Sequence, residues 1–339
     1  MKIAIISVSK KGYKLSLLLK EELNKDSTII STDIFYKNVK KTFKLLFYEY
    51  DAIIAIMASG ILIRSIAPLI ESKASDPAIL NIDEKGNFVI SVLSGHLGGA
   101  NKLTKKLASV INATPVITTA TDVNQKLGID VIAKDLYLTI DNTSEILYFN
   151  KAILENKKIT FRLNSQVNYE FLFDYLDKNT LEINLSIEYD DLVNIDVIEV
   201  IYENHKLTMK IEDIVMGIGC RKGKSMEDIL IGVNKAVSDL NIGKNRISKL
   251  SSAEIKKNEK GILDLGEKLN VPIYFIEIDK LKLLKSNELN ESEFVKSKFG
   301  IGSVSEASAL ITAGFNSKLI YKKTAFNGVT IAIAISKKE

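Results

Sequence analysis

The sequence predicts an α/β protein in which two α/β domains rich in parallel strands flank a smaller α+β region. Three observations lead to this prediction. Apolar β-branched runs alternate with amphipathic helical patterns toward both ends of the chain. Glycine-containing turns next to strands or helices occur in these two stretches but not between them. From about residue 138 to 210, polar and acidic residues alternate with β-branched ones, and Gly and Pro are absent. We therefore expect domains at 1–135, 136–210 and 211–339.

The first stretch alternates predicted strands with predicted helices. Asp51–Met57 (DAIIAIM) carries a continuous apolar run, which is typical of a parallel strand buried on both faces. A short helix follows Ala58 and stops at Pro68. The predicted strands are 2–7, 27–31, 51–57, 88–93 and 115–119, and the predicted helices are 13–23, 39–48 and 101–112.

The last stretch restarts this alternation. Asp213–Cys220 is a predicted strand that enters a glycine turn, and a helix at 305–314 ends at Gly314. Further predicted strands are 247–253, 272–278, 318–323 and 329–336, and further helices are 225–240 and 258–269. The middle region is expected to hold strands that are partly exposed on one face, interspersed with helical patterns at 144–151 and 169–176.

Composition excludes several classes of protein. The net charge is only +4, aromatic residues make up 7% and there is no tryptophan, so nothing indicates a nucleic-acid partner. The apolar runs are far shorter than the ~20 residues of a membrane helix, and the N-terminus resembles a first strand rather than a signal peptide. Cys220 is the single cysteine, so no internal disulfide can form. We therefore expect a cytoplasmic protein with no membrane contact, and a homodimer stays open.

Four small-residue turns are candidate ligand sites: 58–60, 94–99, 217–224 and 299–310. In open parallel sheets, ligands bind at the carboxyl ends of strands, and a following helix offers free N–H groups to an anion. Each turn could therefore contact a carboxylate or a phosphate, or it could merely connect two elements. The second turn, in the stretch SGHLGGAN, contains His96, one of two histidines in the chain.

The stretch GIGCRKGKS fits neither common nucleotide motif. Gly217 and Gly219 match the start of a dinucleotide turn, but Gly223 comes one position late, and the spacing of a phosphate-binding P-loop also fails. ATP and NAD are therefore not expected. The basic residues Arg221 and Lys222 suit a ligand with several carboxylates, although a solvated basic turn explains them as well. Histidine and cysteine spacing indicates no metal site.

Six segments resemble the signature stretches of the cobalt-precorrin-5A hydrolase family of anaerobic cobalamin (vitamin B12) biosynthesis. The resemblance covers residues from about 50 to 130 and from about 211 to 339, and Lys222 stands where an arginine is often expected. The segments are MASGILIRSIAP, SGHLGGANKL, PVITTATD, GIGCRKGKS, KNEKGILDLGEKL and FGIGSVSEASAL.

The resemblance implies a substrate and a reaction. The substrate would be a cobalt-containing tetrapyrrole whose δ-lactone is opened by water, after which the C20 carbon and its methyl group leave as acetaldehyde, giving cobalt-precorrin-5B. The cobalt would be carried by the substrate, so no cofactor and no resident metal are expected.

Lactone hydrolysis needs a base that activates water and donors that stabilise an oxyanion. The candidate catalytic residues are His96, Asp122 and Glu306, and the backbone amides of Gly98 and Gly99 are candidate donors. His96 could instead fix its loop, Asp122 could cap a helix, and Glu306 could complement a helix N-terminus. The candidate substrate-binding residues are Ser59, Gly60, Arg64, Ser94, Gly95, Gly98, Gly99, Asn101, Thr119, Thr121, Gly217, Gly219, Arg221, Lys222, Gly223, Gly302, Ser303 and Ser305.

Two rival functions stay open at the level of sequence. A tetrapyrrole-binding carrier would use the same turns without chemistry, and a sugar-phosphate enzyme could use them for a phosphate. Release of acetaldehyde from the lactone substrate distinguishes the hydrolase from both.

Overall fold

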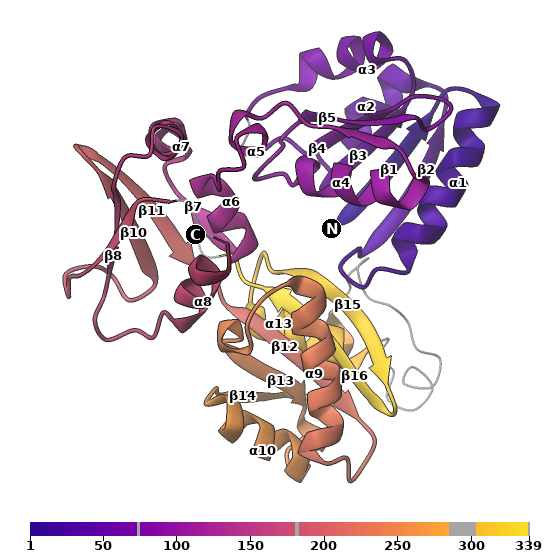
Figure 1. Ribbon diagram of the computed structural model, residues 1–339. Helices are drawn as coiled ribbons and strands as arrows, with labels where there is room; N and C mark the ends of the chain where they lie inside the picture. The colour runs from indigo at the N-terminus through magenta and orange to yellow at the C-terminus, as the bar shows by residue number, and fades with distance from the viewer. Residues whose placement is uncertain (73–74, 180–182, 285–302, 338–339) are drawn as a thin grey trace. The chain divides into compact units, whose positions relative to one another are not determined.

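The computed structural model describes residues 1–72, 75–179, 183–284 and 303–337. It divides into two compact units. The N-terminal unit holds residues 1–134, 138–167 and 177–210, and the C-terminal unit holds residues 135–137, 168–176 and 211–339. Three sheets, one in each of the three regions predicted from the sequence, confirm the mixed α/β class (Figure 1).

The first sheet of the N-terminal unit has six strands in the order β2-β1-β3-β4-β5-β6. Strands β1 to β4 are parallel, β5 runs antiparallel to β4, and β6 is parallel to β5. The strands are β1 (Lys2–Ser7), β2 (Ser31–Tyr36), β3 (Ala52–Ile56), β4 (Ala78–Ile82), β5 (Phe88–Leu93) and β6 (Thr114–Val116). The predicted strand at 27–31 is wrong, because the chain enters the sheet only at Ser31.

Helices cover both faces of this sheet, as expected for strands that are apolar on both sides (Figure 1). Helices α1 (Lys10–Asn24) and α4 (Ala100–Ile111) pack on one face, where Leu19 and Leu107 are fully buried. Helices α2 (Val39–Leu46) and α3 (Ser59–Ile66) pack on the other face. The result is a three-layer sandwich with a core on each side of the sheet.

Strand β4 was not predicted from the sequence, and it determines the direction in which β5 runs and therefore where the following turn lies. It pairs with β5 in an antiparallel hairpin whose register joins Ile79 to Leu93 and Ile82 to Val89. The chain therefore leaves β5 at the edge where β4 begins. The turns at 58–60 and 94–99 each follow the carboxyl end of a strand. Because β3 and β5 run in opposite directions, the two turns lie at opposite ends of the strands of the sheet.

The second sheet of this unit has five strands in the order β7-β11-β10-β8-β9. Strand β10 is antiparallel to β8 and β11, while β8 and β9 are parallel. Buried and half-buried residues alternate along β8, as predicted for strands with one exposed face. The strands are β7 (Leu138–Ile140), β8 (Ile159–Leu163), β9 (Leu185–Tyr189), β10 (Val197–Tyr202) and β11 (His205–Ile211).

Helices α5 (Ala120–Val123) and α6 (Ile129–Asp135) come between the two sheets in the chain, and α7 (Ile146–Leu154) follows β7.

The C-terminal unit has one sheet in the order β14-β13-β12-β16-β15. Strands β12 (Ile214–Cys220), β13 (Lys249–Ala253) and β14 (Ile273–Ile276) are parallel, and a hairpin of β15 (Lys318–Phe326) and β16 (Val329–Ile335) completes it. Helices α9 (Met226–Leu240) and α10 (Lys260–Leu269) cover one face. Helices α11 (Ile278–Leu283) and α13 (Val304–Ala313) cover the other, and α8 (Glu170–Asn179) falls largely within this unit.

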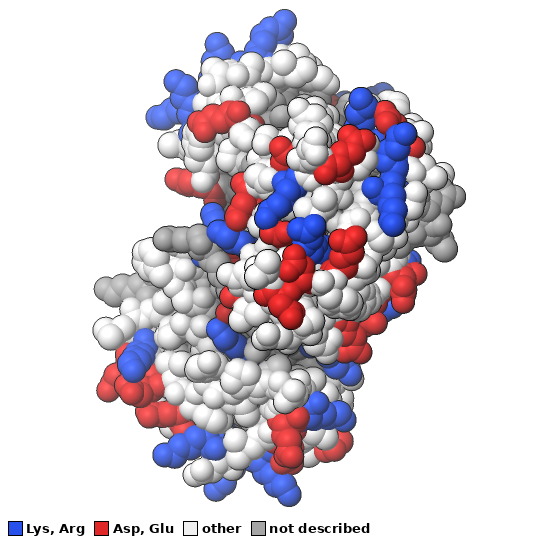
Figure 2. Space-filling view, turned by 90° about the vertical axis from the view of Figure 1, so that its left-hand side faces the viewer, with Lys and Arg blue, Asp and Glu red and all other residues white. Residues whose placement is uncertain are grey.

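On the face drawn in Figure 2, basic and acidic side chains are interspersed. This distribution accords with the small net charge and leaves no continuous basic patch on that face. None of the described helices is long and apolar enough to cross a membrane.

Candidate active site

The turn between β5 and α4 is compact because two of its glycines leave no room for a side chain. A Cβ at Gly98 would overlap the Cβ of Ser94, and a Cβ at Gly95 would lie 2.7 Å from the side-chain oxygen of Asn101. Gly99 has a φ of +89°, a conformation that glycine adopts without strain, and α4 begins directly after it. The glycines therefore shape the turn, which presents the side chain of His96.

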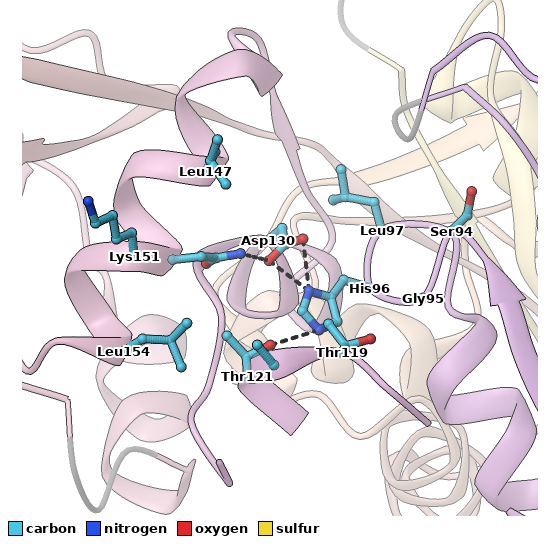
Figure 3. Close-up of a pocket in the computed structure, with 12 residues that line it drawn as sticks. Ser94, Gly95, His96, Leu97, Thr119, Thr121, Asp130, Leu147, Lys151 and Leu154 are labelled. Carbon is cyan, nitrogen blue, oxygen red and sulfur yellow. Dashed lines mark hydrogen bonds and ion pairs between the residues drawn. The ribbon is translucent and has the colours of Figure 1, made fainter. Parts of the chain in front are cut away.

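His96 lies between the carboxylates of Asp130 and Asp122, of which Figure 3 shows Asp130. Its Nδ1 is 3.0 and 3.1 Å from the two oxygens of Asp130, and its Nε2 is 3.0 Å from Oδ2 of Asp122. The side chain is only 9% exposed. Ionised carboxylates accept hydrogen bonds but cannot donate them, so both ring nitrogens must carry a proton. The geometry favours an imidazolium.

The balance of electrostatic effects agrees with a charged ring. Burial alone would lower the pKa of His96, but hydrogen bonds and charge interactions with Asp130 and Asp122 outweigh it and raise the pKa above 6.5. Burial alone would raise the pKa of each carboxyl, yet contact with His96 keeps the pKa of both below the ordinary value. The three side chains form one coupled unit.

Asn101 on α4 holds Asp122 in place. Its Nδ2 donates to Oδ2 of Asp122 at 2.8 Å and to the Thr119 hydroxyl at 3.0 Å, while its Oδ1 accepts from Ser91 at 2.6 Å. Lys105, one turn further along α4, pairs with the other oxygen of Asp122 at 3.2 Å. Asp122 is thus surrounded by donors and fixed in its ionised form.

Thr121 shares the same ring nitrogen. Its hydroxyl oxygen lies 3.1 Å from Nε2 of His96, and the residue is only 3% exposed (Figure 3). If the imidazolium donates from Nε2, the Thr121 oxygen accepts, and its own proton is free to point to another acceptor.

A pocket of about 510 Å³ opens beside this cluster. Figure 3 shows Asp130 between the loop that carries His96 and the side chains of α7. Asp130 lines the pocket, whereas Asp122 is not among the lining residues. The lining residues are Ser94, Gly95, His96, Leu97, Thr119, Ala120, Thr121, Asp130, Leu147, Asn150, Lys151 and Leu154.

The structure brings together the predicted residues of two signature segments and adds residues that the sequence reasoning missed. His96, Asp122, Asn101, Thr119 and Thr121 are joined by hydrogen bonds. The missed residues are Ser91, Lys105, Asp130, Asn150 and the α7 residues Leu147, Lys151 and Leu154. These residues lie in no recognisable motif. The sequence offered one signal for Asp130: a histidine in a buried polar turn needs a hydrogen-bond partner for its second ring nitrogen.

Three predicted substrate-binding residues lie at the opposite edge of the first sheet. Ser59 donates to Oδ1 of Asn81 at 2.6 Å, and exposed Arg64 donates to the carbonyl oxygen of Gly60 at 3.0 Å. Ser59, Gly60 and Arg64 are not among the residues that line the pocket beside His96.

In the C-terminal unit, two of the predicted glycines make room for neighbouring parts of the chain. A Cβ at Gly217 would overlap the carbonyl oxygen of Ser305 in α13, and a Cβ at Gly219 would lie 2.5 Å from the side-chain oxygen of Thr330 in β16. Helix α13 therefore fills the space that a ligand would need at Gly217. Ser303 caps this helix by accepting from the amide of Glu306 at 3.4 Å.

The other described residues that were predicted in this unit are either buried or exposed. Glu306 is 0% exposed, and its carboxylate accepts from the amide of Lys323 at 2.8 Å. Arg221, Lys222 and Gly223 are exposed. Gly302 lies outside the described residues.

The comparisons with known proteins agree with these two units. Residues 41–122 match the family described as cobalamin synthesis G N-terminal, and residues 214–334 match cobalamin synthesis G C-terminus. A curated cobalt-precorrin-5A hydrolase from Priestia megaterium is 29% identical over 314 residues, which cover 89% of this chain and 83% of that protein. A curated probable cobalt-precorrin-5A hydrolase from Methanocaldococcus jannaschii is 32% identical over 98% of this chain and 99% of that protein.

A solved structure shares the fold over nearly the whole chain. The crystal structure of a cobalamin biosynthesis protein G homolog from Sulfolobus solfataricus matches with a TM-score of 0.60 and 29% identity, covering 99% of this chain and 97% of that one. Fold and relatives thus define the class, a hydrolase of cobalamin biosynthesis. The chain belongs to the cobalamin synthesis G family.

Proposed function

We propose that this protein hydrolyses cobalt-precorrin-5A, opening its δ-lactone and releasing the C20 carbon with its methyl group as acetaldehyde. The observation that carries the proposal is the Asp122–His96–Asp130 cluster at the wall of a ligand-sized pocket. The names of the relatives support the substrate, because two curated proteins of similar length carry it in their names. The cobalt belongs to the substrate.

The pocket suits part of a large, flat ring better than a small polar metabolite. Leu97, Leu147 and Leu154 supply apolar walls, and Leu147 leaves 68% of its surface open to a ligand. A tetrapyrrole buries apolar ring surface and carries carboxylates at its rim, where they meet solvent or basic side chains. The pocket volume of about 510 Å³ accommodates the lactone edge of such a molecule.

The cluster favours a role for His96 that differs from the general base considered from the sequence. A ring that is already protonated on both nitrogens cannot accept another proton from water. We instead assign the imidazolium the role of stabilising the negative charge that develops on the lactone carbonyl oxygen. The single Nε2–H is shared between Oδ2 of Asp122 and the Thr121 oxygen, at 3.0 and 3.1 Å, and the charge of the ring strengthens the Thr121 hydroxyl as a donor toward the lactone carbonyl oxygen.

Asp130 is the carboxylate that faces the pocket, so we assign it to the attacking water. Water attacks the acyl carbon, one of its protons passes to Asp130, and the acyl–oxygen bond breaks. The same proton then returns to the departing ring oxygen, which becomes a hydroxyl group. The hydroxyl group then gives its proton to the ionised Asp130 and its C–O bond becomes a carbonyl. The bond from C20 to the macrocycle breaks, its electron pair stays on the macrocycle, which takes up the proton, and acetaldehyde leaves. Asp122, held by Asn101 and Lys105, keeps the ring charged.

A carrier that binds the tetrapyrrole without chemistry is the second candidate, because it would need the same pocket. It would not need a charged histidine against a pocket-facing carboxylate. Anaerobic incubation of the purified protein with cobalt-precorrin-5A, followed by an assay for acetaldehyde, separates the two. Stoichiometric binding without acetaldehyde would overturn the hydrolase and leave the carrier.

A further inference from the structure

We infer that Asn150 on α7 is a positioning residue of the active site, which fixes Asp130 against His96 and makes the middle region of the chain part of the catalytic apparatus. The effects that we expect on kcat rest on the proposed function. The hydrogen bonds of Asn150, from which the inference is drawn, do not depend on the identity of the substrate.

Both ends of the Asn150 amide bind the first turn of α6. Its Nδ2 donates to Oδ1 of Asp130 at 3.0 Å, and its Oδ1 accepts from the amide of Ile129 at 2.8 Å. Gly128 makes the approach possible, because a Cβ there would lie 2.8 Å from Oδ1 of Asp130 and 3.1 Å from Oδ1 of Asn150. One side chain thus ties α7 to the backbone and to the carboxylate of α6.

The bond to Asn150 sets the plane of the Asp130 carboxylate. Both oxygens of Asp130 face Nδ1 of His96, at 3.1 and 3.0 Å, and Asn150 occupies a remaining acceptor direction of Oδ1. Without it, the carboxylate could rotate about its side-chain torsion and lose the two-oxygen contact with the ring. A neutral amide is suited to this position because it donates to one group and accepts from the other.

The charged groups around His96 determine how a substitution of Asn150 would change the pKa of the ring. Asp130 approaches from α6 and Asp122 from α5, while Lys105 of α4 stands behind Asp122. Lys151 of α7 lines the same pocket and extends away from His96 in Figure 3. Loosening Asp130 removes part of the negative charge that stabilises the imidazolium, so the pKa of His96 should fall toward its ordinary value.

The test uses two substitutions that differ in what they keep. Asn150→Asp preserves shape and the acceptor for the Ile129 amide, but it places a second carboxylate beside Asp130. Repulsion should raise the pKa of Asp130, so the acid limb of the pH profile of kcat should move to higher pH. Asn150→Ala removes both bonds. It should lower the pKa of His96 and reduce kcat about tenfold, the value of one hydrogen bond to a charged group, with KM little changed.

The readouts are nitrogen-15 NMR of the histidine rings as a function of pH, and the kinetics of acetaldehyde release. The chain has only two histidines, so the signals are readily assigned. Asn184→Asp is the matched control, since it makes the same change at an exposed asparagine of the same region, whose amide donates to the carbonyl oxygen of Asn156 at 3.4 Å. It should leave the pKa of His96 and kcat unchanged.

The inference is overturned if both Asn150 variants keep the pKa of His96, the pH profile and kcat of the parent protein. A fall in stability alone, with these quantities unchanged in the folded fraction, would also overturn it, because Asn150 would then be only a structural link. The NMR titration needs no substrate. Its result therefore stands even if the parent protein releases no acetaldehyde, an outcome that would defeat the proposed function instead.

Discussion

The turn after β5 and the turn after β12 resemble each other in sequence, and yet they use glycine for different purposes. In the first, Gly95 and Gly98 allow a tight loop that presents His96 to two carboxylates. At the second, Gly217 lies within β12 just before the turn and lets α13 approach the strand so closely that no ligand fits between them. A glycine turn at the end of a strand therefore predicts a close approach, but not whether a ligand or another part of the chain makes it.

The largest effect is expected at the first turn. His96→Ala removes the imidazolium and its stabilisation of the oxyanion, so acetaldehyde release should be slower by about 10²–10³, while the fold and substrate binding persist. His205→Ala is the matched control, because that histidine pairs with Glu145 away from the pocket. Near-normal turnover by a well-folded His96→Ala would remove the ring from the mechanism and leave the chemistry to the carboxylates.

The next largest effect separates the hydroxyl of Thr121 from its bulk. Thr121→Val keeps the shape and should lower kcat about 10²-fold, as does the loss of one donor to an oxyanion, with KM unchanged. Thr121→Ser keeps the hydroxyl and should retain most of the activity. Equal rates for the valine and serine variants would show that the hydroxyl does not act on the substrate.

In β12, just before the second turn, the expected effect is on stability. Gly217→Ala forces α13 away from β12 and should destabilise the C-terminal unit by about 3 kcal/mol in urea unfolding. Gly223→Ala is the comparison, since Gly223 has a φ of +78° but no neighbour within 4 Å, so only the backbone strain of ~1–2 kcal/mol remains. The reverse order of the two effects would contradict the packing role of Gly217.

The smallest effect is expected for the basic residues of the second turn. Arg221 and Lys222 are exposed, and exposed charge pairs are worth roughly 0–1 kcal/mol, so the double alanine variant should raise KM about fivefold or less. A hundredfold rise in KM would instead place a carboxylate of the substrate in this turn.

Much of the architecture follows from apolar patterning, and the exceptions have physical reasons. Long runs such as Ala52–Ile56 are buried on both faces and are recognisable as central strands. Strand β4 is also fully buried, but its apolar run is interrupted by Asn81, whose amide binds backbone carbonyls of the neighbouring strand and the residue after it. Because β4 was not predicted, its hairpin with β5 was not predicted either. The sequence therefore did not indicate that His96 lies at the opposite ends of the strands from Ser59 and Arg64.

The site was partly accessible from sequence for a similar reason. His96, Asn101 and Asp122 lie in segments with distinctive small and polar residues, whereas Asp130 and Asn150 sit in ordinary helical patterns. They reach His96 only because α6 and α7 fold back onto the turn, and that contact depends on tertiary packing. Which of the site residues act in catalysis stays a prediction.

The most direct test of the central claim is the protonation state of His96. Nitrogen-15 NMR of histidine-labelled protein, assigned with His205→Gln, reports whether each ring nitrogen carries a proton. Because contact with Asp130 and Asp122 raises the pKa of His96, we expect the imidazolium to persist to higher pH than in a free histidine, and kcat to fall as the pH rises through that pKa. A neutral ring at pH 7 with an unprotonated Nε2 would contradict the account and return His96 to the role of general base.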